Sequence, residues 1–368
     1  MKEAQENKRP LCKRVSERKK RVYHTGEVYG MKKGMLLVLL LLVVFSMGTA
    51  GFAADKKVYN LRIAIATNPP HPWHEAANFL VKELDARTDG AVKLKIFGGS
   101  QLGSEQTVFE EMRLGTIDIL VGGATTLVNF IPELGVLNMP YFYSGVDQFR
   151  KVMDPRGPVV NKFREIYEEK NFGVRLLTFG GGGTRVMSNN LKTITHPDHL
   201  KGLKMRVPNN PEDAKIWSSA GAIVTAMPWN EIYSALQTGV INAFESTLSA
   251  YYGSKFYEVA KNMSNTQHII MVSHLLISEA TWKKLPEEYR KIFDELSDEV
   301  SRIYTDKGEE FDKAIMKDLQ EKYGVSVSEV DKAAFMEKFQ SLHDELAAKG
   351  NNQALLKLLR DTRDAVSR

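Results

Sequence analysis

Hydrophobic and polar positions follow two different periods along the chain from residue 61 onward. The apolar runs LRIAIAT (61–67) and IDILV (117–121) predict buried strands, and VKLKIF (92–97) alternates as a half-buried strand does. Between the first two strands, WHEAANFLVKELDART (73–88) places apolar residues at helical spacing. Strands and helices in alternation predict a βαβ unit and therefore an α/β fold.

The same order continues through the rest of the chain. Ser104 is the predicted N-cap of a helix over 105–114, and Gly115 ends that helix. A helix over 156–170 then precedes a strand over 172–179. Later strands are predicted over 184–189, 203–208, 222–227, 241–246 and 268–278, and later helices over 211–221, 229–239 and 286–323. An amphipathic helical tail follows, which we expect to pack on the outside.

Two α/β units with the chain crossing between them predict two lobes and a cleft. After a predicted leader about 315 residues remain, which is more than one core usually holds. The first lobe is expected to comprise 55–181 and about 270–305, and the second 182–269 and about 306–368, including the C-terminal helices. Ligands of such folds sit at strand ends and helix N-termini.

The N-terminal segment, residues 1–53, has the pattern of a signal peptide. An uncharged apolar run over 35–47 follows basic residues, and it is shorter than the roughly 20 residues of a spanning helix. Small residues before Asp55 predict cleavage after Ala53 or Ala54, and Met31 is the predicted true start.

Removing this leader changes the interpretation of charge and redox chemistry. The remaining chain has 39 Lys and Arg against 41 Asp and Glu, so its net charge is about −2 and no general attraction to nucleic acid or anionic lipid is expected. The only cysteine, Cys12, lies in the leader. We therefore expect a periplasmic protein without disulfides, thiol nucleophile or lipid anchor.

Four glycines at 180–183 stand directly before Thr184 and Arg185. A phosphate-binding loop is disfavoured, because GGGGTR lacks the lysine followed by Ser or Thr and is not a G-x-G-x-x-G before a helix. Two interpretations remain open. The glycines form a flexible crossover between lobes, or their missing Cβ atoms let a ligand approach the backbone beside Arg185.

Catalytic and metal motifs are incomplete. The HEAAN segment at His74 lacks the second histidine of a zinc-protease helix, and His196 and His199 have no third ligand near them. GGSQL at 98–102 lacks the closing glycine of a nucleophile elbow. The sequence therefore predicts no catalytic residues, no metal and no cofactor.

Arg206 lies in the strand LKMRVP, in which Leu203, Met205 and Val207 are apolar. Lys204 and Arg206 therefore share the opposite face. That face is either exposed to solvent or lines the cleft, where a guanidinium can grip a carboxylate with two parallel hydrogen bonds.

Several ordered stretches give the chain a specific resemblance. GGSQLGSEQTVFEEMRLGTIDI, LKGLKMRVPNNPEDAKIWSSAGA, MPWNEIYSALQTGVINAFES and KFYEVAKNMSNTQHII resemble the DctP-type solute receptors of tripartite ATP-independent periplasmic (TRAP) transporters. The resemblance implies a type II-like, two-lobed periplasmic-binding-protein fold with a long helix spanning both lobes. It also implies that the protein is no enzyme: it captures an organic acid and delivers it to the small and large membrane subunits of a permease driven by an ion gradient. A receptor of an ATP-driven importer and a periplasmic enzyme are the alternatives.

The resemblance also implies ligand-binding residues. The family's carboxylate-gripping arginine falls on Arg206, and a second arginine of its sialic-acid branch falls on Arg185. Asn209 and Trp229 match positions that contact or cover the ligand. On this hypothesis the glycines make room for substrate beside Arg185.

Further matches concern the segment NAFES and the strand that contains His268. Glu245 is retained from the family's motif, whereas Ser246 replaces an asparagine that commonly bonds the acid. His268 resembles a family histidine that partners the glutamate, so we expect Glu245 and His268 to orient the two arginines.

One departure from the family bears on the ligand. In the sialic-acid branch a glutamate and an arginine follow the GTIDI strand, whereas this chain has Gly122 and Thr125 there. Sialic acid is therefore disfavoured. Smaller sugar acids, dicarboxylates and hydroxy, oxo or aromatic monocarboxylates remain open.

Overall fold

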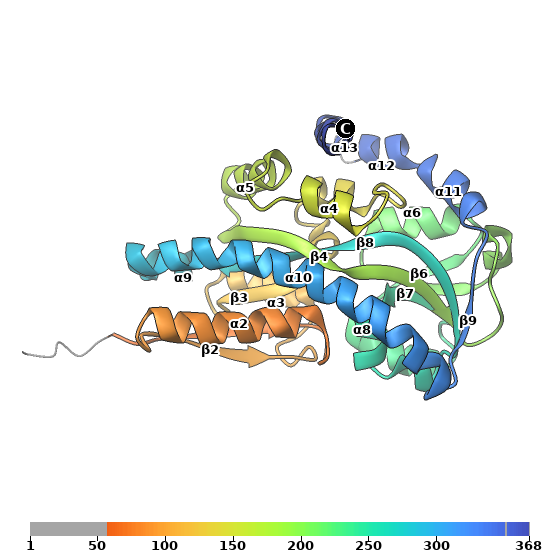
Figure 1. The fold of residues 1–368 in the computed structure, drawn as a ribbon, viewed down its shortest axis with the longest axis horizontal. Helices are drawn as coiled ribbons and strands as arrows, with labels where there is room; N and C mark the ends of the chain where they lie inside the picture. Colours follow the sequence, from red (N-terminus) through yellow and green to blue (C-terminus); the bar gives the residue numbers. More distant parts are fainter. Residues whose placement is uncertain (1–56, 350–351, 368) are drawn as a thin grey trace, which may run out of the picture. The chain divides into compact units, whose positions relative to one another are not determined.

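The computed structural model describes residues 57–349 and 352–367, which belong to one compact unit (Figure 1). The predicted leader, with Met31, Cys12 and the cleavage site, lies outside the described residues. None of the described helices combines the length and apolar composition needed to cross a lipid bilayer.

The strands of this unit join in one mixed sheet. They are β1 (Tyr59–Ile65), β2 (Val92–Phe97), β3 (Ile119–Gly123), β4 (Val174–Asn189), β5 (Lys204–Val207), β6 (Ile223–Ala226), β7 (Ala243–Thr247), β8 (Asn262–Ser278) and β9 (Ser326–Ser328). Their order across the sheet is β2-β1-β3-β8-β4-β7-β5-β6, and β9 pairs with β8.

Helices and short 3₁₀ turns connect these strands. The α-helices are α2 (Pro72–Arg87), α3 (Glu105–Arg113), α4 (Val146–Val152), α5 (Pro158–Lys170), α6 (Pro211–Ser219), α7 (Ile232–Gln237), α8 (Leu248–Gly253), α9 (Glu279–Lys284), α10 (Glu287–Glu321), α11 (Lys332–Gln340), α12 (His343–Lys349) and α13 (Gln353–Val366). The 3₁₀ turns are η1 (Ala124–Leu127), η2 (Pro132–Asn138), η3 (Pro197–Leu200), η4 (Trp229–Glu231) and η5 (Phe256–Glu258).

The long strands β4 and β8 run antiparallel through the middle of the sheet and connect its two parts. The first part of β4 pairs with the last part of β8, which also pairs with β3 and so continues to β1 and β2. From Arg185 to Asn189, β4 pairs with β7, which continues to β5 and β6. The predicted lobe limits stay a prediction, since this pairing is continuous.

Side-chain alternation on the strands divides the core between the two faces of the sheet. Ile119 and Val121 of β3 join an apolar cluster with α2 and α10, whereas Leu120 between them joins a cluster with α3 and α5. The tail contributes Leu355, Leu356 and Leu359 of α13 to the second cluster, where α13 contacts α4 and α5.

Most predicted elements of the first half are confirmed. The helix predicted over 73–88 is α2, and the strand over 92–97 is β2. Ser104 caps α3, because its hydroxyl accepts a hydrogen bond from the Thr107 backbone N–H. Gly115 follows α3 with a positive φ of 74°, the conformation that glycine adopts without strain.

Four predicted elements were wrong in extent. The strands over 172–179 and 184–189 are one strand, β4, which continues through the glycines. Strand β8 begins at Asn262, six residues before its predicted start at 268, and the helix predicted over 229–239 is the turn η4 followed by the short helix α7. Pairing with neighbouring strands overrides the low strand propensity of glycine and polar residues.

The glycines of β4 allow α10 to pack directly on the strand. A Cβ on Gly180 would lie 2.7 Å from the Ser301 carbonyl oxygen, and one on Gly308 of α10 would lie 2.6 Å from the Gly183 nitrogen. Helix α10 is 35 residues long, or about 52 Å at 1.5 Å per residue. It contacts α2 and α8 as well as β4, so one helix spans both parts of the sheet (Figure 1).

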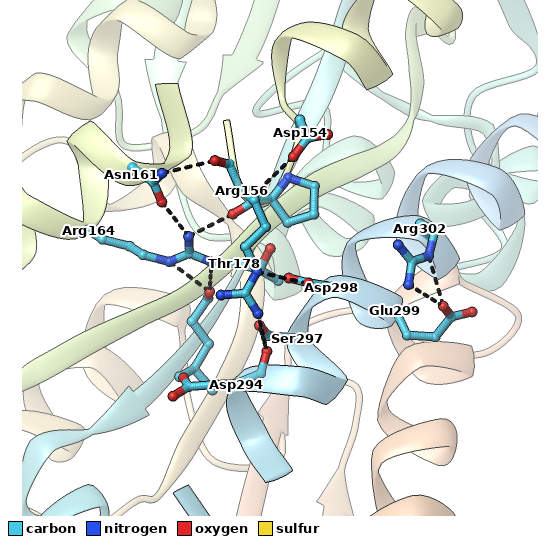
Figure 2. A network of polar contacts seen from close by, with 12 residues as sticks. Asp154, Arg156, Asn161, Arg164, Thr178, Asp294, Ser297, Asp298, Glu299 and Arg302 are labelled. Atoms are coloured by element: carbon cyan, nitrogen blue, oxygen red, sulfur yellow. Dashed lines mark hydrogen bonds and ion pairs between the residues drawn. The ribbon is translucent and has the colours of Figure 1, made fainter. Parts of the chain in front are cut away.

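Polar contacts tie α10 to the segment that carries α5. Figure 2 shows Arg156 donating to the Asp298 carboxylate at 2.8 Å and to the Asp294 carbonyl oxygen at 2.9 Å. Arg164 of α5 donates through Nη2 to the Leu177 carbonyl oxygen of β4 at 2.6 Å. Helix α10, α5 and β4 are therefore joined by hydrogen bonds as well as by apolar contact.

Gly180→Ala tests the packing of α10 on β4. A methyl group within 3 Å of backbone atoms forces the helix or strand to move, so we expect the free energy of unfolding to fall by about 1–3 kcal/mol. Urea denaturation measures the change. Gly145→Ala is the control, because its φ of 170° suits any residue and no atom lies within 4 Å of the added Cβ. Equal stability of the two variants would contradict the packing account.

Candidate ligand-binding site

A cavity lies at the ends of several strands, where the first and second parts of the sheet meet. Its walls include residues that follow β1, β3 and β5, the carboxyl ends at which α/β folds bind ligands. The cavity measures about 70 Å³, whereas one water needs about 10–15 Å³. It therefore has room for a small molecule. Its polar lining residues are Thr67, His71, Trp73, Ser100, Ser104, Glu105, Gln106, Thr125, Thr126, Asn138, Arg185, Arg206, Asn209, Asp213 and Trp229.

Arg206 lines this cavity and is buried, with 4% of its surface exposed. Its Nε and Nη2 atoms donate to the Met227 carbonyl oxygen at 3.0 and 2.8 Å, which fixes the guanidinium plane. No carboxylate of a described residue lies within 4.0 Å of it, and Nη1 has no hydrogen-bond partner among those residues. Of the two alternatives left open for this face, the solvent-exposed one is therefore excluded, and Arg206 lines the cavity.

Arg185 lines the same cavity but already has a counter-ion. Its Nε and Nη2 atoms bind both carboxylate oxygens of Glu245, and Nη2 also donates to the Glu245 carbonyl oxygen at 3.2 Å. Among the described residues, its Nη1 atom has one hydrogen-bond contact, to the Met271 sulfur at 3.5 Å. Arg185 is thus held in place by a two-pronged ion pair and presents its remaining nitrogen toward the cavity.

Glu245 and His268 are fully buried behind Arg185. The His268 Nε2 atom lies 3.5 Å from Glu245 Oε2, and His268 Nδ1 shares a hydrogen bond of 2.9 Å with the Thr266 hydroxyl. Burial alone would raise the pKa of Glu245, but the charge of Arg185, the close approach of His268 and the hydrogen bonds from Arg185 hold that pKa well below its usual range. Glu245 is therefore an anion in the folded protein.

Trp229 follows Pro228 at the start of η4, and one side of its ring faces the cavity. The Arg206 Cζ atom lies 5.9 Å from its ring centre, within the range of a cation–π contact. Its ring also packs edge-on against Phe256 at 5.2 Å between centres. Trp229 therefore packs against an apolar cluster and also lines the cavity.

Two carboxyl groups that line the cavity were not predicted: Glu105, which is half-buried, and Asp213, which is buried. Glu105 follows the cap of α3, and its Oε1 accepts from the Gly123 backbone N–H at 2.8 Å. Asp213 lies in the first turn of α6, and its Oδ1 accepts from the Asn138 side-chain amide at 2.9 Å. Burial raises the pKa of each to about 7; for Asp213 the charge of Glu245 adds to this effect.

His71 and Trp73 are further cavity residues that the sequence interpretation missed. His71 caps α2 with Nδ1, while its buried Nε2 has no hydrogen-bond partner among the described residues. Burial lowers its pKa well below the usual value, so the ring is neutral. Trp73 donates to the Ser273 hydroxyl at 2.7 Å. Their position at the N-terminus of a predicted helix that follows a predicted strand could have indicated that His71 and Trp73 line the cavity.

The other predicted residues divide into two groups. Asn209 and Thr125 line the cavity, whereas Gly122 and Ser246 do not. Ser246 points to the opposite face of β7 from Glu245, and a Cβ on Gly122 would meet Glu105 and His274. Contact of the cavity-lining residues with a ligand stays a prediction.

The glycines beside Arg185 do not clear space for a ligand in the way expected. Added Cβ atoms at Gly180, Gly181 and Gly183 would meet residues of α10, and one at Gly182 would meet Ser273 and Met271. The hypothesis that the run makes room for substrate was therefore wrong for three of the four positions. Gly180, Gly181 and Gly183 instead allow helix α10 to pack closely against the strand.

The incomplete motifs have structural explanations in the described residues. His74 Nε2 bonds the Thr67 carbonyl oxygen at 2.8 Å, and His196 and His199 accept from backbone N–H groups around η3. Among residues 57–349 and 352–367, no group of three or more His, Cys, Asp or Glu side chains is placed to hold a metal ion.

Comparisons with known proteins agree with this architecture. The family model described as bacterial extracellular solute-binding protein, family 7 (DctP), matches residues 63–350. A solute-binding protein of Chromohalobacter salexigens is 29% identical over 338 residues, which cover 92% of this chain and 96% of that protein.

Two solved structures are similar over almost their whole length. A TRAP periplasmic solute-binding protein of Sulfitobacter sp. with bound β-D-galacturonate is 28% identical with a TM-score of 0.77, covering 82% of this chain and 100% of that chain. One of Chromohalobacter salexigens with bound D-glucuronate is 29% identical with a TM-score of 0.76, covering 83% and 99%.

The mixed sheet and its cavity define a two-lobed solute-binding protein of the periplasmic-binding class, as predicted. The chain belongs to the bacterial extracellular solute-binding proteins of family 7, the DctP family. Members of this family are receptors of TRAP transporters and not enzymes, which confirms both the resemblance and the prediction that this chain is no enzyme.

Glu245→Gln tests the buried ion pair. The substitution leaves Arg185 without its charged partner, so we expect the free energy of unfolding at pH 7 to fall by about 3–5 kcal/mol. Because the folded-state pKa of Glu245 lies below the unfolded value of about 4.3, its contribution is present above that pH and is lost as the pH falls further. Urea denaturation at pH 7 and about pH 3 should show the difference shrinking.

Glu168→Gln is the matched control for this substitution. Glu168 also pairs with an arginine, Arg175, but its side chain is 59% exposed. Exposed pairs contribute about 0–1 kcal/mol, so the control should remain close to the wild type. A loss as small in Glu245→Gln as in Glu168→Gln would contradict the assigned role.

Proposed function

We propose that this chain captures an organic acid by its carboxylate and that Arg206 is the anchor. The observation that carries the proposal is a buried guanidinium in the cavity with unused N–H groups and no carboxylate partner among the described residues. Burial lowers the pKa of Arg206 only to about 10, so it stays charged at pH 7. A ligand carboxylate supplies the missing counter-ion.

The binding free energy that these contacts can supply is that of a receptor that binds its ligand reversibly. A hydrogen bond to a charged group contributes roughly 1.5–3 kcal/mol net, whereas micromolar binding needs about 8 kcal/mol. Two bonds from Arg206 therefore supply part of the affinity. Contact with Trp229, polar contacts from Asn209 and Thr125, and exclusion of water supply the rest.

Arg185 has a smaller share in this proposal. Its ion pair with Glu245 uses Nε and Nη2, which leaves Nη1 to reach the ligand. Glu245 and His268 act as positioning residues, because they fix the orientation of Arg185 without lining the cavity.

The relatives favour hydroxylated acids among the classes left open by the sequence. The two solved structures hold D-galacturonate and D-glucuronate, which are both monocarboxylates with several hydroxyl groups. We extend this class to the present chain as part of the proposal.

The remaining steps follow from the family. Ligand binding shifts an equilibrium between open and closed lobes, for which we keep the limits 55–181 with about 270–305 and 182–269 with about 306–368. The closed receptor then delivers its ligand to the small and large membrane subunits of a TRAP permease in the periplasm. An ATPase gene, rather than genes for those two subunits, beside this gene would favour the ATP-driven importer.

A thermal-shift panel tests the function and Arg206→Ala tests the anchor. We expect D-glucuronate, D-galacturonate or D-gluconate to raise the melting temperature of residues 55–368, because a ligand of the native state stabilises it by mass action. D-Glucose and L-leucine should not.

Calorimetric titration then measures the affinity of the variants. Arg206→Ala should weaken binding more than tenfold, while the control Lys204→Ala, an exposed position of the same strand, should not. Shifts from neutral compounds alone would refute the carboxylate class, and unchanged affinity in a folded Arg206→Ala would refute the anchor.

A further inference from the structure

Asp213 presents an unused oxygen to the ligand cavity. The residue is 3% exposed and is held by Asn138, which donates to Oδ1 at 2.9 Å. Its Oδ2 atom makes no hydrogen bond to any described residue. Because Asp213 lines the cavity, this oxygen is free to bond a polar group of a ligand.

The charges around the cavity do not balance if every carboxyl group is ionised. Arg185 and Arg206 supply two positive charges, and the anion of Glu245 neutralises one of them. Ionised Glu105 and Asp213 would bring the carboxylates at the cavity, together with Glu245 behind Arg185, to three for two guanidiniums. A carboxylate ligand would add a fourth, at a large desolvation cost.

Within the part of the chain that the structure describes, no other charged group acting on Asp213 offsets this excess. Glu245 on β7 repels a charge on Asp213, while Arg185 on β4 and Arg206 on β5 attract it. Burial lowers the pKa of both His71 and His268, so these rings are neutral at pH 7. With Asp213 and Glu105 protonated, one ligand anion leaves the site electrically neutral.

We propose that Asp213 is a second recognition residue, which binds in its protonated form and donates from Oδ2 to a hydroxyl oxygen of a monocarboxylate held on Arg206. This inference rests on the proposed function. It narrows the ligand to a hydroxylated monoanion, because the second carboxylate of a dicarboxylate would face Asp213 and Glu105. It also means that ligand binding takes up a proton when Asp213 starts ionised.

Ligand affinity is expected to fall as the pH rises. The pKa of Asp213 in the free protein is raised to about 7 by burial and by Glu245, so below pH 7 the residue is already protonated. Above pH 7 the ligand must bind together with a proton. If only the form with protonated Asp213 binds, and binding leaves the protonation of Glu105 unchanged, affinity falls about tenfold between pH 6 and pH 8.

The test is a calorimetric titration of residues 55–368 with D-glucuronate, D-galacturonate and D-gluconate, carried out at pH 6 and at pH 8. We expect the tenfold loss in the wild type, and a proton uptake at pH 7.5 visible as a heat that depends on the ionisation enthalpy of the buffer. Succinate should bind at least tenfold more weakly than the acid of the panel that binds most tightly.

Variants assign the effect to one residue. The amide of Asp213→Asn donates at every pH, so this variant should bind several-fold more tightly than the wild type at pH 8 and lose most of the pH dependence. Asp213→Ala should lose affinity at pH 6. Asp312→Asn is the matched control, because burial also raises the pKa of Asp312 to about 7 but the residue does not line the cavity.

Each outcome separates the inference from the proposed function. If none of the three acids binds at either pH, the proposed function fails and the inference fails with it. Binding that is independent of pH, without proton uptake, overturns the inference alone. A pH dependence that Glu105→Gln removes and Asp213→Asn retains overturns the assignment to Asp213, as does weaker binding of Asp213→Asn at pH 8. The wild-type heats decide the question even if a variant fails to fold.

Discussion

Direct contact between helix α10 and strand β4 is the constraint on which the rest of the structure depends. The backbone of Gly308 lies against Gly183, and Gly180 lies against Ser301, so a side chain on any of the glycines would separate the two elements. Because β4 belongs to both parts of the sheet, α10 spans both parts as well. The glycine run thus fixes the crossing of the chain between them, rather than the ligand.

The geometry of the candidate site depends on this contact between α10 and β4. Arg185 follows the last glycine by two residues, and its neighbours on β7 and β8 supply Glu245 and His268. Arg206 comes from the end of β5, where the Met227 carbonyl oxygen orients it. Arginines from two strands therefore line one cavity, with Glu245 of β7 behind Arg185, and the mutual charges of the groups at the cavity influence which of them is ionised.

The sequence was sufficient for features that depend on local pattern. Periodicity predicted α2, β2 and α10, and the alternation in LKMRVP placed Arg206 opposite the apolar side chains. The sequence was insufficient where contacts between residues far apart in the chain determine the structure. Glycine is a poor strand former, yet pairing with β8 before and after an irregularity at 182–183 carries β4 through four of them. Glu105 and Asp213 have the pattern of ordinary acids in a first helical turn, and only the fold turns them into the cavity.

Arg206 has no carboxylate partner among the described residues, and this unpaired charge lowers the stability of the ligand-free protein. A partner inside the protein would stabilise the fold, as Glu245 does for Arg185, but it would also compete with the ligand for the same N–H groups. Holding Arg206 by a neutral carbonyl oxygen fixes its position without neutralising its charge. The unpaired cation therefore makes the stability of the folded protein depend on the ligand, which is the property that a receptor requires.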